Sequence, residues 1–416
     1  MMLHIPPALH HRKFRLLWLG LMISVAGAQM QLWAIFWHIR SLTDQPIALG
    51  TVGLARILPV VVFSLVGGAL ADVVNRRKMM FYTQCALTLI ALMLAALSFN
   101  ERMELWHIYL LTGMQAMVAA FDLPARQALV PNLVPAADLP NAFSLTSIAF
   151  QTGAIVGPAL SGFVIAYLGQ GYTYLINAVT YLAVILALIL MGQVPLSRTE
   201  GKRPAVSLDA IQDGIRFISQ QPMILSTMLL DFFATFFSSA NTLMPIVARD
   251  ILKVGAVEYG WLSAAQSIGA VIASLVASQL DQIRRQGPVL LISVMLFGLA
   301  TILFGLSRSF LLAMLALMLI GASDSVSMII RNTIRQLQTP DHMRGRMTSV
   351  NQIFFMGGPQ LGEVEAGVTA QLFGAPFAII SGGIGCLLAV GWVTRRWPML
   401  RTYSGNEPAL AGVSAD

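Results

Sequence analysis

Long apolar stretches, each about the length of a membrane crossing, recur along the whole chain with short polar breaks between them. A helix needs about 20 mostly apolar residues to cross the hydrocarbon core of a bilayer. Windows of that length predict helices near 14–39, 48–70, 78–98, 105–122, 141–168 and 172–193. A second set follows near 223–249, 257–280, 287–306, 309–330, 345–372 and 375–394. We therefore expect an all-α membrane protein with twelve transmembrane helices.

The positive charges are concentrated in every second break between these stretches. With both termini in the cytoplasm, twenty of the 26 Lys and Arg residues fall on the inner side, five fall on the outer side, and Arg56 lies within the second predicted helix. Because cytoplasmic loops of membrane proteins are enriched in Lys and Arg, this bias predicts cytoplasmic termini and an even number of crossings.

Composition narrows the class of protein further. With 56% hydrophobic and 11% charged residues, the chain lacks the polar surface that soluble domains of this size require. The net charge of +7 arises from the loop cations, so we expect no nucleic-acid partner. Cys85 and Cys386 both lie within apolar stretches, which argues against a disulfide framework or a metal cluster.

The first apolar run follows a basic segment but is too long for the core of a signal peptide, so we expect it to remain as the first membrane helix. The sequence contains no phosphate-binding loop, zinc-protease motif or nucleophile elbow. These observations predict a protein without a cofactor and without enzymatic activity.

The longest hydrophilic break divides the predicted helices into two equal sets. It gives an N-terminal six-helix bundle (1–193), a cytoplasmic linker (194–221), a C-terminal six-helix bundle (222–396) and a cytoplasmic tail (397–416). Within the linker, residues 207–217 suit either an amphipathic helix on the membrane surface or a plain solvated segment.

The two predicted bundles repeat each other in sequence. Arg331, Pro340, Gly358, Gly362, Gly367 and Gly374 each follow an identical residue type by 205 positions, as 331 − 126 shows for the arginine pair. This register indicates a duplicated six-plus-six transporter with its site between the halves.

The break after the second predicted helix places Gly68 ahead of Asp72, which is followed by Arg76 and Arg77. A glycine lets two helices approach closely, and an aspartate can accept N–H groups at a helix N-terminus or pair with the cations. This segment resembles the loop signature of the major facilitator superfamily, G-x-L-A-D-x-x-x-R-R/K. The resemblance implies a fold of two pseudosymmetric six-helix bundles.

A weaker copy of the signature follows the eighth predicted helix and includes Asp281, Arg284 and Arg285. In the superfamily this loop acts as a cytoplasmic latch, so the resemblance assigns Gly68, Asp72, Arg76, Arg77 and the copy to gating. The alternative is that the cations only set the topology.

The fifth predicted helix contains Gly153, Gly157, Pro158 and Gly162. Glycines one turn apart make a flat face, and a proline within a helix removes one hydrogen bond. The pattern resembles the glycine motif of proton-coupled exporters in the superfamily, although the second glycine after the proline is missing. Simple close packing of helices is the alternative interpretation.

Few charged side chains fall within predicted helices, where each costs at least about 2.5 kcal/mol unless it is paired or hydrated. They are Arg56, Asp122, Asp231, Asp324, Glu363 and Glu365. We expect Asp122 and Asp324 to form caps or pairs with Arg126 and Arg331. Our hypothesis is that Glu363 or Glu365 takes up and releases a coupling proton, and the alternative is a glutamate satisfied by a neighbouring helix.

Three other residues are candidates for the substrate pathway. Asp231 precedes a cluster of phenylalanines that suits an apolar binding cavity or a lipid-facing surface. Gln29 is placed to line the outer vestibule. The fourth helix lacks the arginine that many proton-coupled relatives carry, so Arg56 is expected to replace it or to extend to the interface.

Three short segments resemble the branch of the superfamily that contains bacterial enterobactin exporters and drug–proton antiporters. They are residues 49–59, the Gly68 loop and residues 362–367. This resemblance implies proton-driven efflux of a siderophore or amphiphilic drug across the bacterial inner membrane. It also implies a monomer in contact with membrane lipid. The alternatives are an uptake carrier for a small metabolite and a lipid or lysolipid flippase.

Overall fold

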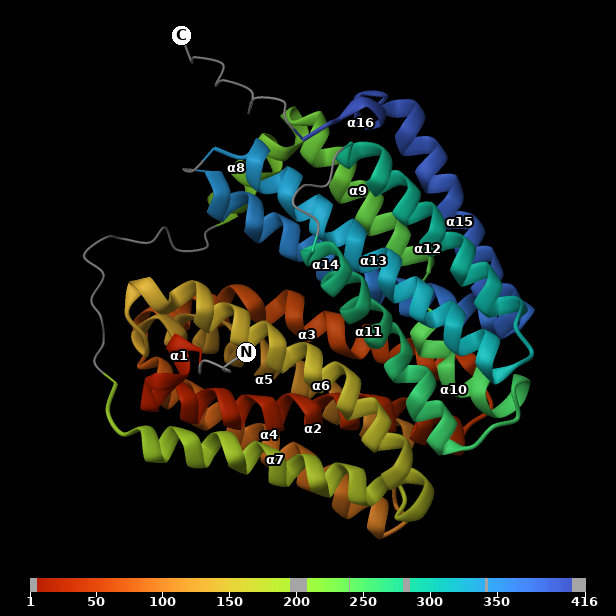
Figure 1. Cartoon of the computed structure of the whole chain (residues 1–416). Helices are drawn as coiled ribbons and strands as arrows, with labels where there is room; N and C mark the ends of the chain where they lie inside the picture. The colour runs from red at the N-terminus through yellow and green to blue at the C-terminus, as the bar shows by residue number, and fades with distance from the viewer. Residues whose placement is uncertain (1–5, 195–207, 239, 280–284, 341–342, 406–416) are drawn as a thin grey trace. The chain divides into compact units, whose positions relative to one another are not determined.

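A computed structural model of the chain describes residues 6–194, 208–238, 240–279, 285–340 and 343–405 (Figure 1). Its regular elements in these ranges are helices. The first group comprises α1 (Pro7–His10), α2 (Arg12–Leu42), α3 (Pro46–Val73), α4 (Arg76–Phe99), α5 (Leu105–Leu129), α6 (Leu139–Tyr167) and α7 (Gln170–Met191). The second comprises α8 (Leu208–Gln220), α9 (Pro222–Phe237), α10 (Met244–Ile246), α11 (Ala256–Ser278), α12 (Gln286–Leu306), α13 (Phe310–Gln338), α14 (Arg344–Phe373), α15 (Ala375–Arg396) and α16 (Met399–Thr402).

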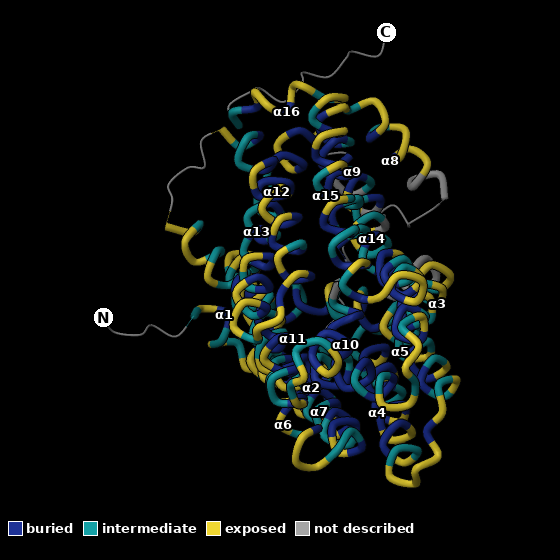
Figure 2. Tube along the Cα trace, turned by 90° about the vertical axis from the view of Figure 1, so that its right-hand side faces the viewer, coloured by how far each residue is buried: buried dark blue, intermediate teal, exposed yellow. Residues whose placement is uncertain are grey.

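Eleven helical segments in the described part are long and apolar enough to cross a membrane. The predicted span at 345–372 appears as the 30-residue helix α14, which falls outside those eleven because its sequence is less apolar. Exposed positions recur along many of the helices (Figure 2). Large apolar side chains occupy many of these positions, including Leu58, Val61, Leu311 and Leu388. Such side chains are satisfied by lipid tails, so their exposure fits a membrane-embedded surface.

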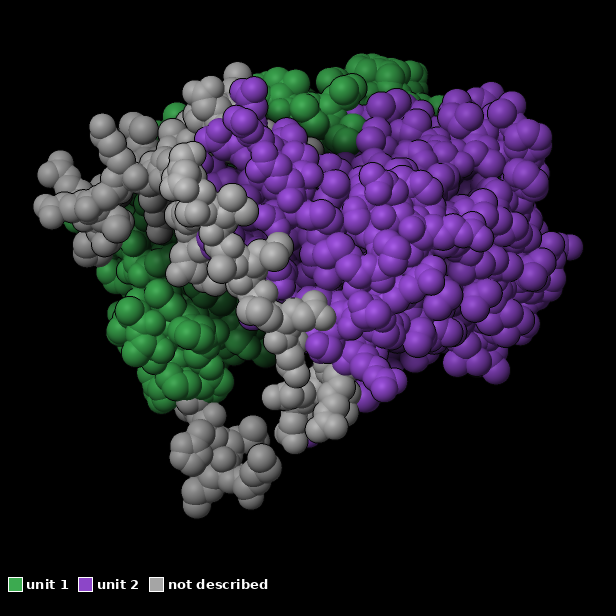
Figure 3. All heavy atoms as spheres, turned by 90° about the horizontal axis from the view of Figure 1, so that it is seen from above, with its two compact units in different colours: residues 1–44, 55–206, 254–264 green, residues 45–54, 207–253, 265–416 purple. Residues whose placement is uncertain are grey.

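The chain forms two compact units (Figure 3). Unit 1 consists of residues 1–44, 55–206 and 254–264, and unit 2 of residues 45–54, 207–253 and 265–416. Two helices are therefore shared: α3 begins in unit 2 and continues in unit 1, whereas α11 begins in unit 1 and continues in unit 2.

In unit 1, α2 packs along both α6 and α7, while α4 packs against α5 and α7. Small residues make this packing close: a Cβ placed on Gly20 would lie 3.2 Å from the Cα of Val184. The core beside these contacts includes Phe14, Leu17 and Leu188, all of which are buried. The result is a bundle in which the first span is enclosed by its neighbours.

In unit 2, α12 packs against α13 and α15, and α9 packs against α14 and α15. The sequence predicted one helix over 223–249, but α9 ends at Phe237. The chain continues through a 3₁₀ turn at Ala240–Leu243, the short α10 and a π-helical turn at Val247–Ile251. Pro245 lacks the N–H that would bond the carbonyl of Asn241 in a continuous α-helix, so the chain cannot be regular α-helix through this segment.

The linker contains the helix α8, so this part of the linker is helical as one of the two alternatives required, while its place on the membrane surface stays a prediction. Gly214 of α8 approaches α14 closely enough that an added Cβ would lie 3.0 Å from the carbonyl oxygen of Arg346. Ile218 is buried in a cluster with Ile224, Met347 and Val350. Ile215, in contrast, is 53% exposed. The helix is therefore docked on unit 2 by one face and leaves another face open.

Candidate functional site

Unit 1 contains a buried ion pair within α5. Arg126 Nη2 lies 2.5 Å from Asp122 Oδ2, and both residues are largely buried. Asp122 Oδ1 also accepts hydrogen bonds from Thr83 Oγ1 at 2.7 Å and from Gln84 Nε2 at 2.9 Å. The expected pairing of Asp122 with Arg126 is confirmed, and hydrogen bonds to α4 complete the cluster.

Unit 2 contains a larger charged cluster that links α9, α13 and α14. Arg331 lies 2.9 Å from Asp231 Oδ1 and 3.3 Å from Asp324 Oδ1, which confirms the expected pair with Asp324. One turn further along α13, Arg335 donates to the carbonyl oxygen of Arg331 at 3.0 Å and to Asn351 Oδ1. Both arginines are at most 3% exposed.

The sequence prediction counted Arg126, Arg331 and Arg335 among the cations of cytoplasmic loops, and this was wrong because all three lie within helices. The predicted helices ended at 122 and 330, but α5 continues to Leu129 and α13 to Gln338. The buried carboxylates balance the positive charges, so the helices can include the arginines. The signal available in the sequence was the 205-residue repeat that relates Arg126 to Arg331.

A chain of buried amides connects three helices of unit 1. Asn177 Nδ2 of α7 donates to Gln31 Oε1 of α2 at 2.7 Å, and Gln31 Nε2 donates to Gln115 Oε1 of α5 at 2.7 Å. Asn177 and Gln31 are at most 1% exposed, whereas Gln115 is half-buried. Sequence reasoning missed Gln115 and Asn177, because single amides within apolar helices have no motif.

The predicted pathway residues in α2 and α3 lie elsewhere in unit 1. Gln29 is half-buried, and its Cβ packs against Gly157 of α6. A Cβ added to Gly157 would lie 2.6 Å from the Cβ of Gln29. Arg56 is half-buried on α3.

Glu363 and Glu365 have different surroundings on α14. Glu363 is 8% exposed and faces the first turns of α3, where a Cβ on Gly53 would lie 3.1 Å from its Oε2. Glu365 is half-buried and accepts a hydrogen bond from Thr369 Oγ1 at 2.8 Å on the same helix. Only Glu363 therefore makes a close approach to the shared helix α3 in the contacts described here.

The glycine motif of α6 brings backbones together at two places. Added Cβ atoms on Gly153 and Gly157 would lie 3.0 Å from backbone nitrogens of α2, and one on Gly162 would lie 2.9 Å from the Cα of Gly260 in α11. The repeat-related Gly367 of α14 makes the same kind of contact in unit 2, with Gly50 of α3. Pro158 is buried within α6.

The predicted gating segments are described only in part. Arg76 donates to the carbonyl oxygen of Ala128 at 3.1 Å, and Arg77 donates to that of Leu188 at 2.7 Å. These bonds satisfy carbonyls near helix C-termini. Gly68 and Asp72 lie in α3, with their side-chain environment outside the described part, and Asp281 and Arg284 lie outside the described residues. Arg285 precedes α12 with φ of 56°.

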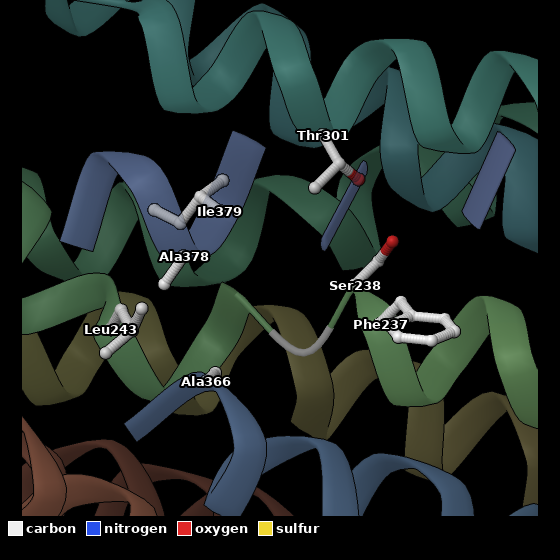
Figure 4. Close-up of a pocket in the computed structure, with 7 residues that line it drawn as sticks. All are labelled: Phe237, Ser238, Leu243, Thr301, Ala366, Ala378 and Ile379. Carbon is white, nitrogen blue, oxygen red and sulfur yellow. The ribbon is translucent and has the colours of Figure 1, made fainter. Parts of the chain in front are cut away.

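The phenylalanines after Asp231 pack mainly on one another. Phe232 stacks on Phe236 with ring centroids 5.9 Å apart, and Phe233 stacks on Phe237 at 6.2 Å. The hollow at the end of α9, with Thr301 and Ile379 among its lining residues, has essentially no room for a water molecule (Figure 4). It is therefore too small to bind an amphiphile.

Comparisons with known proteins place the chain among membrane transporters. Residues 6–409 match the family described as transmembrane secretion effector. The chain is 29% identical over 383 residues to an enterobactin exporter, EntS, of Shigella boydii serotype 18, covering 91% of this chain and 90% of that protein. It is 28% identical over the same length to the enterobactin exporter EntS of Escherichia coli O81.

Solved structures show the same fold at lower identity. A bacterial homologue of the human lysosomal transporter Spinster, in an inward-facing and unoccupied conformation, matches with a TM-score of 0.74 at 13% identity over 96% of this chain and all of that one. A POT family transporter in complex with 5-aminolevulinic acid matches with a TM-score of 0.71 at 14% identity, covering 96% of this chain and 98% of that one.

Proposed function

Because the chain belongs to the transmembrane secretion effector family of major facilitator superfamily transporters, we propose that it exports a siderophore or a similar amphiphile across the bacterial inner membrane, driven by protons. The chain is a membrane transporter and not an enzyme. The observation that carries the proposal is the match to enterobactin exporters over 91% of the chain. A match of that extent includes both repeats as well as the linker.

We assign the coupling proton to Glu363. Its carboxylate approaches Gly53 in the first turns of α3, a helix that the two units share. Gly53 and Glu363 both belong to unit 2, and α3 passes into unit 1 at residue 55. In this proposal a movement of the units bends or shifts α3 next to Gly53, and this alters the surroundings of Glu363. A buried carboxylate whose exposure to water alternates is suited to bind a proton on one side and to release it on the other.

The other buried acids serve a different purpose in this proposal. Asp122 and Asp231 each balance a buried arginine, and removal of that balance would leave an uncompensated charge in the protein interior. We therefore assign them to fixed ion pairs that hold helices together. Glu365 bonds within its own helix and is assigned no role in coupling.

Transport into inside-out membrane vesicles tests both parts of the proposal. An imposed pH gradient, acidic inside, should drive uptake of enterobactin by the wild-type protein, and dissipating the gradient should stop it. Glu363→Gln should abolish gradient-driven uptake, while the matched control Glu365→Gln should retain it. Full transport by both variants would remove glutamate coupling from consideration.

Assays in vesicles and in intact cells distinguish the other functions of this fold. Movement of lipid without a pH gradient would favour a flippase, and accumulation of the compound in intact cells would favour an uptake carrier. An export defect in a deletion strain, restored by the gene, is the result that supports efflux in the cell.

Reporter tags on both termini should be protected from external protease if both lie in the cytoplasm, as the charge bias predicts.

A further inference from the structure

The buried amide chain of unit 1 has a direction. Thr180 Oγ1 has one hydrogen to share between two oxygens of Asn177, the backbone oxygen at 2.7 Å and Oδ1 at 3.0 Å. This leaves Asn177 Nδ2 to donate to Gln31, and Gln31 Nε2 to donate to Gln115 Oε1. An amide has one accepting and one donating end. Among the residues that the structure describes, the chain therefore ends with Gln115, which offers its Nε2 hydrogens.

A second polar group lies one helical turn before Gln115. Thr112 is 4% exposed, and its hydroxyl is buried without a hydrogen-bond partner in the described part of the protein. Residues three apart share a face of a helix, so Thr112 and Gln115 project from the same side of α5. A buried hydroxyl that lacks a partner costs about 1–3 kcal/mol, which a bound oxygen atom or a water molecule would offset.

The polar groups that α5 itself offers beside Gln115 are uncharged. The nearest charged pair on α5, Asp122 with Arg126, begins seven residues from Gln115, which is about 10 Å along the helix axis. Its two charges also compensate each other. What α5 offers here is a set of uncharged donors, which suit a carbonyl, ester or hydroxyl oxygen.

We propose that Gln115 and Thr112 form the polar end of the substrate site and bind a neutral oxygen of the exported amphiphile. This inference rests on the proposed export function. Asn177 and Thr180 act as positioning residues, because they fix which end of the Gln115 amide faces the substrate. In the described part of the protein the amide chain ends at Gln115, which is half-buried.

Export of a matched pair of amphiphiles tests the assignment. The two probes differ only in a carbonyl oxygen that is replaced by a methylene group, and the readout is the ratio of their transport at low concentration. One hydrogen bond to an uncharged group contributes about 0.5–1.5 kcal/mol, so Gln115→Met and Thr112→Val should each lower the wild-type preference for the carbonyl probe by about threefold to tenfold.

Thr88→Val is the matched control, because Thr88 is also a buried threonine but its hydroxyl already donates to the carbonyl oxygen of Gln84 at 2.8 Å. This variant should keep the wild-type ratio. Thr180→Val should lower the ratio less than Gln115→Met. It removes the hydroxyl that orients the Asn177 amide, but it keeps the donor, Gln115 Nε2.

The outcomes separate this inference from the proposed function. If the wild-type protein exports neither probe nor enterobactin, the export function itself fails. If the wild-type protein exports the probes and Gln115→Met and Thr112→Val, folded as judged by gel filtration in detergent, keep the wild-type ratio, the assignment of the polar end is overturned. Equal loss of both probes in Gln115→Met would indicate a structural role and would also overturn it.

Discussion

The two units carry arginines at equivalent positions of the repeat but balance them differently. In unit 1, Arg126 pairs with Asp122 one turn away on the same helix, and α4 contributes only uncharged hydrogen-bond donors. In unit 2, Arg331 pairs with Asp231 of α9, a helix a hundred residues earlier in the chain. A duplicated cation can thus serve as a local ion pair in one half and as a cross-link between helices in the other.

The largest effect should follow from breaking the cross-link of unit 2. Asp231→Asn leaves Arg331, which is 2% exposed, with the more exposed Asp324 as its remaining acidic partner. Removing one partner of a buried ion pair costs about 3–5 kcal/mol. We expect a marked fall in the unfolding temperature of the detergent-purified protein, followed by intrinsic fluorescence.

Asp324→Asn is the control for that experiment, because the Asp324 side chain is 44% exposed and its contact with Arg331 is longer. Its effect should be small. Equal destabilisation by the two variants would contradict the view that Asp231 is the principal partner of Arg331.

The local pair of unit 1 should tolerate the same substitution better. Asp122→Asn keeps a side-chain oxygen that can accept from Thr83 and Gln84, and Arg126 also lies 5.6 Å from the ring centre of Phe150. We expect a loss of about 1–3 kcal/mol, less than for Asp231→Asn, because the Arg126 side chain is 14% exposed and the Arg331 side chain only 2%. A stability loss as large as that of Asp231→Asn would show that the intrahelical pair is no less critical than the cross-link.

The helices of both units were largely predictable from the sequence, and the reason is physical. Membrane spans must be about 20 apolar residues long, so most predicted boundaries lie within about three residues of those observed. The prediction was wrong where polar residues belong to a helix, as at Arg126 and Arg331, and where α9 is interrupted after Phe237. In those places partners from other helices decide the structure, and a single sequence does not reveal them.

The candidate sites show the same division. Charged residues at membrane depth stand out in the sequence because they are rare, and this identified Asp122, Asp231 and Glu363. The amide chain was not predictable, because Gln115 and Asn177 acquire a role only when α2, α5 and α7 pack together. The assignments of coupling, gating and substrate residues remain predictions that transport measurements must test.

Substitution of a glycine at a close helix contact should destabilise the two units to a similar extent. Gly162 meets Gly260 in unit 1 and Gly367 meets Gly50 in unit 2, each with an added Cβ 2.8–2.9 Å from a backbone Cα. Backbone cannot yield as a flexible side chain does, so Gly162→Ala and Gly367→Ala should each cost about 1–3 kcal/mol. Thermal unfolding measures this, and Gly357→Ala is the control, because its added Cβ would meet nothing within 4 Å. A large effect in one unit only would break the symmetry that the repeat implies.

The smallest effect is expected at the linker helix, which docks on unit 2. Asp213 of α8 lies 3.2 Å from Arg346 of α14, and their side chains are 52% and 39% exposed. Exposed ion pairs contribute about 0–1 kcal/mol because water and salt screen them. Asp213→Ala should therefore barely change the unfolding temperature, while Ile218→Ala, which removes a buried side chain from the same helix, should lower it clearly. The reverse order would mean that charge, and not apolar packing, holds α8 on unit 2.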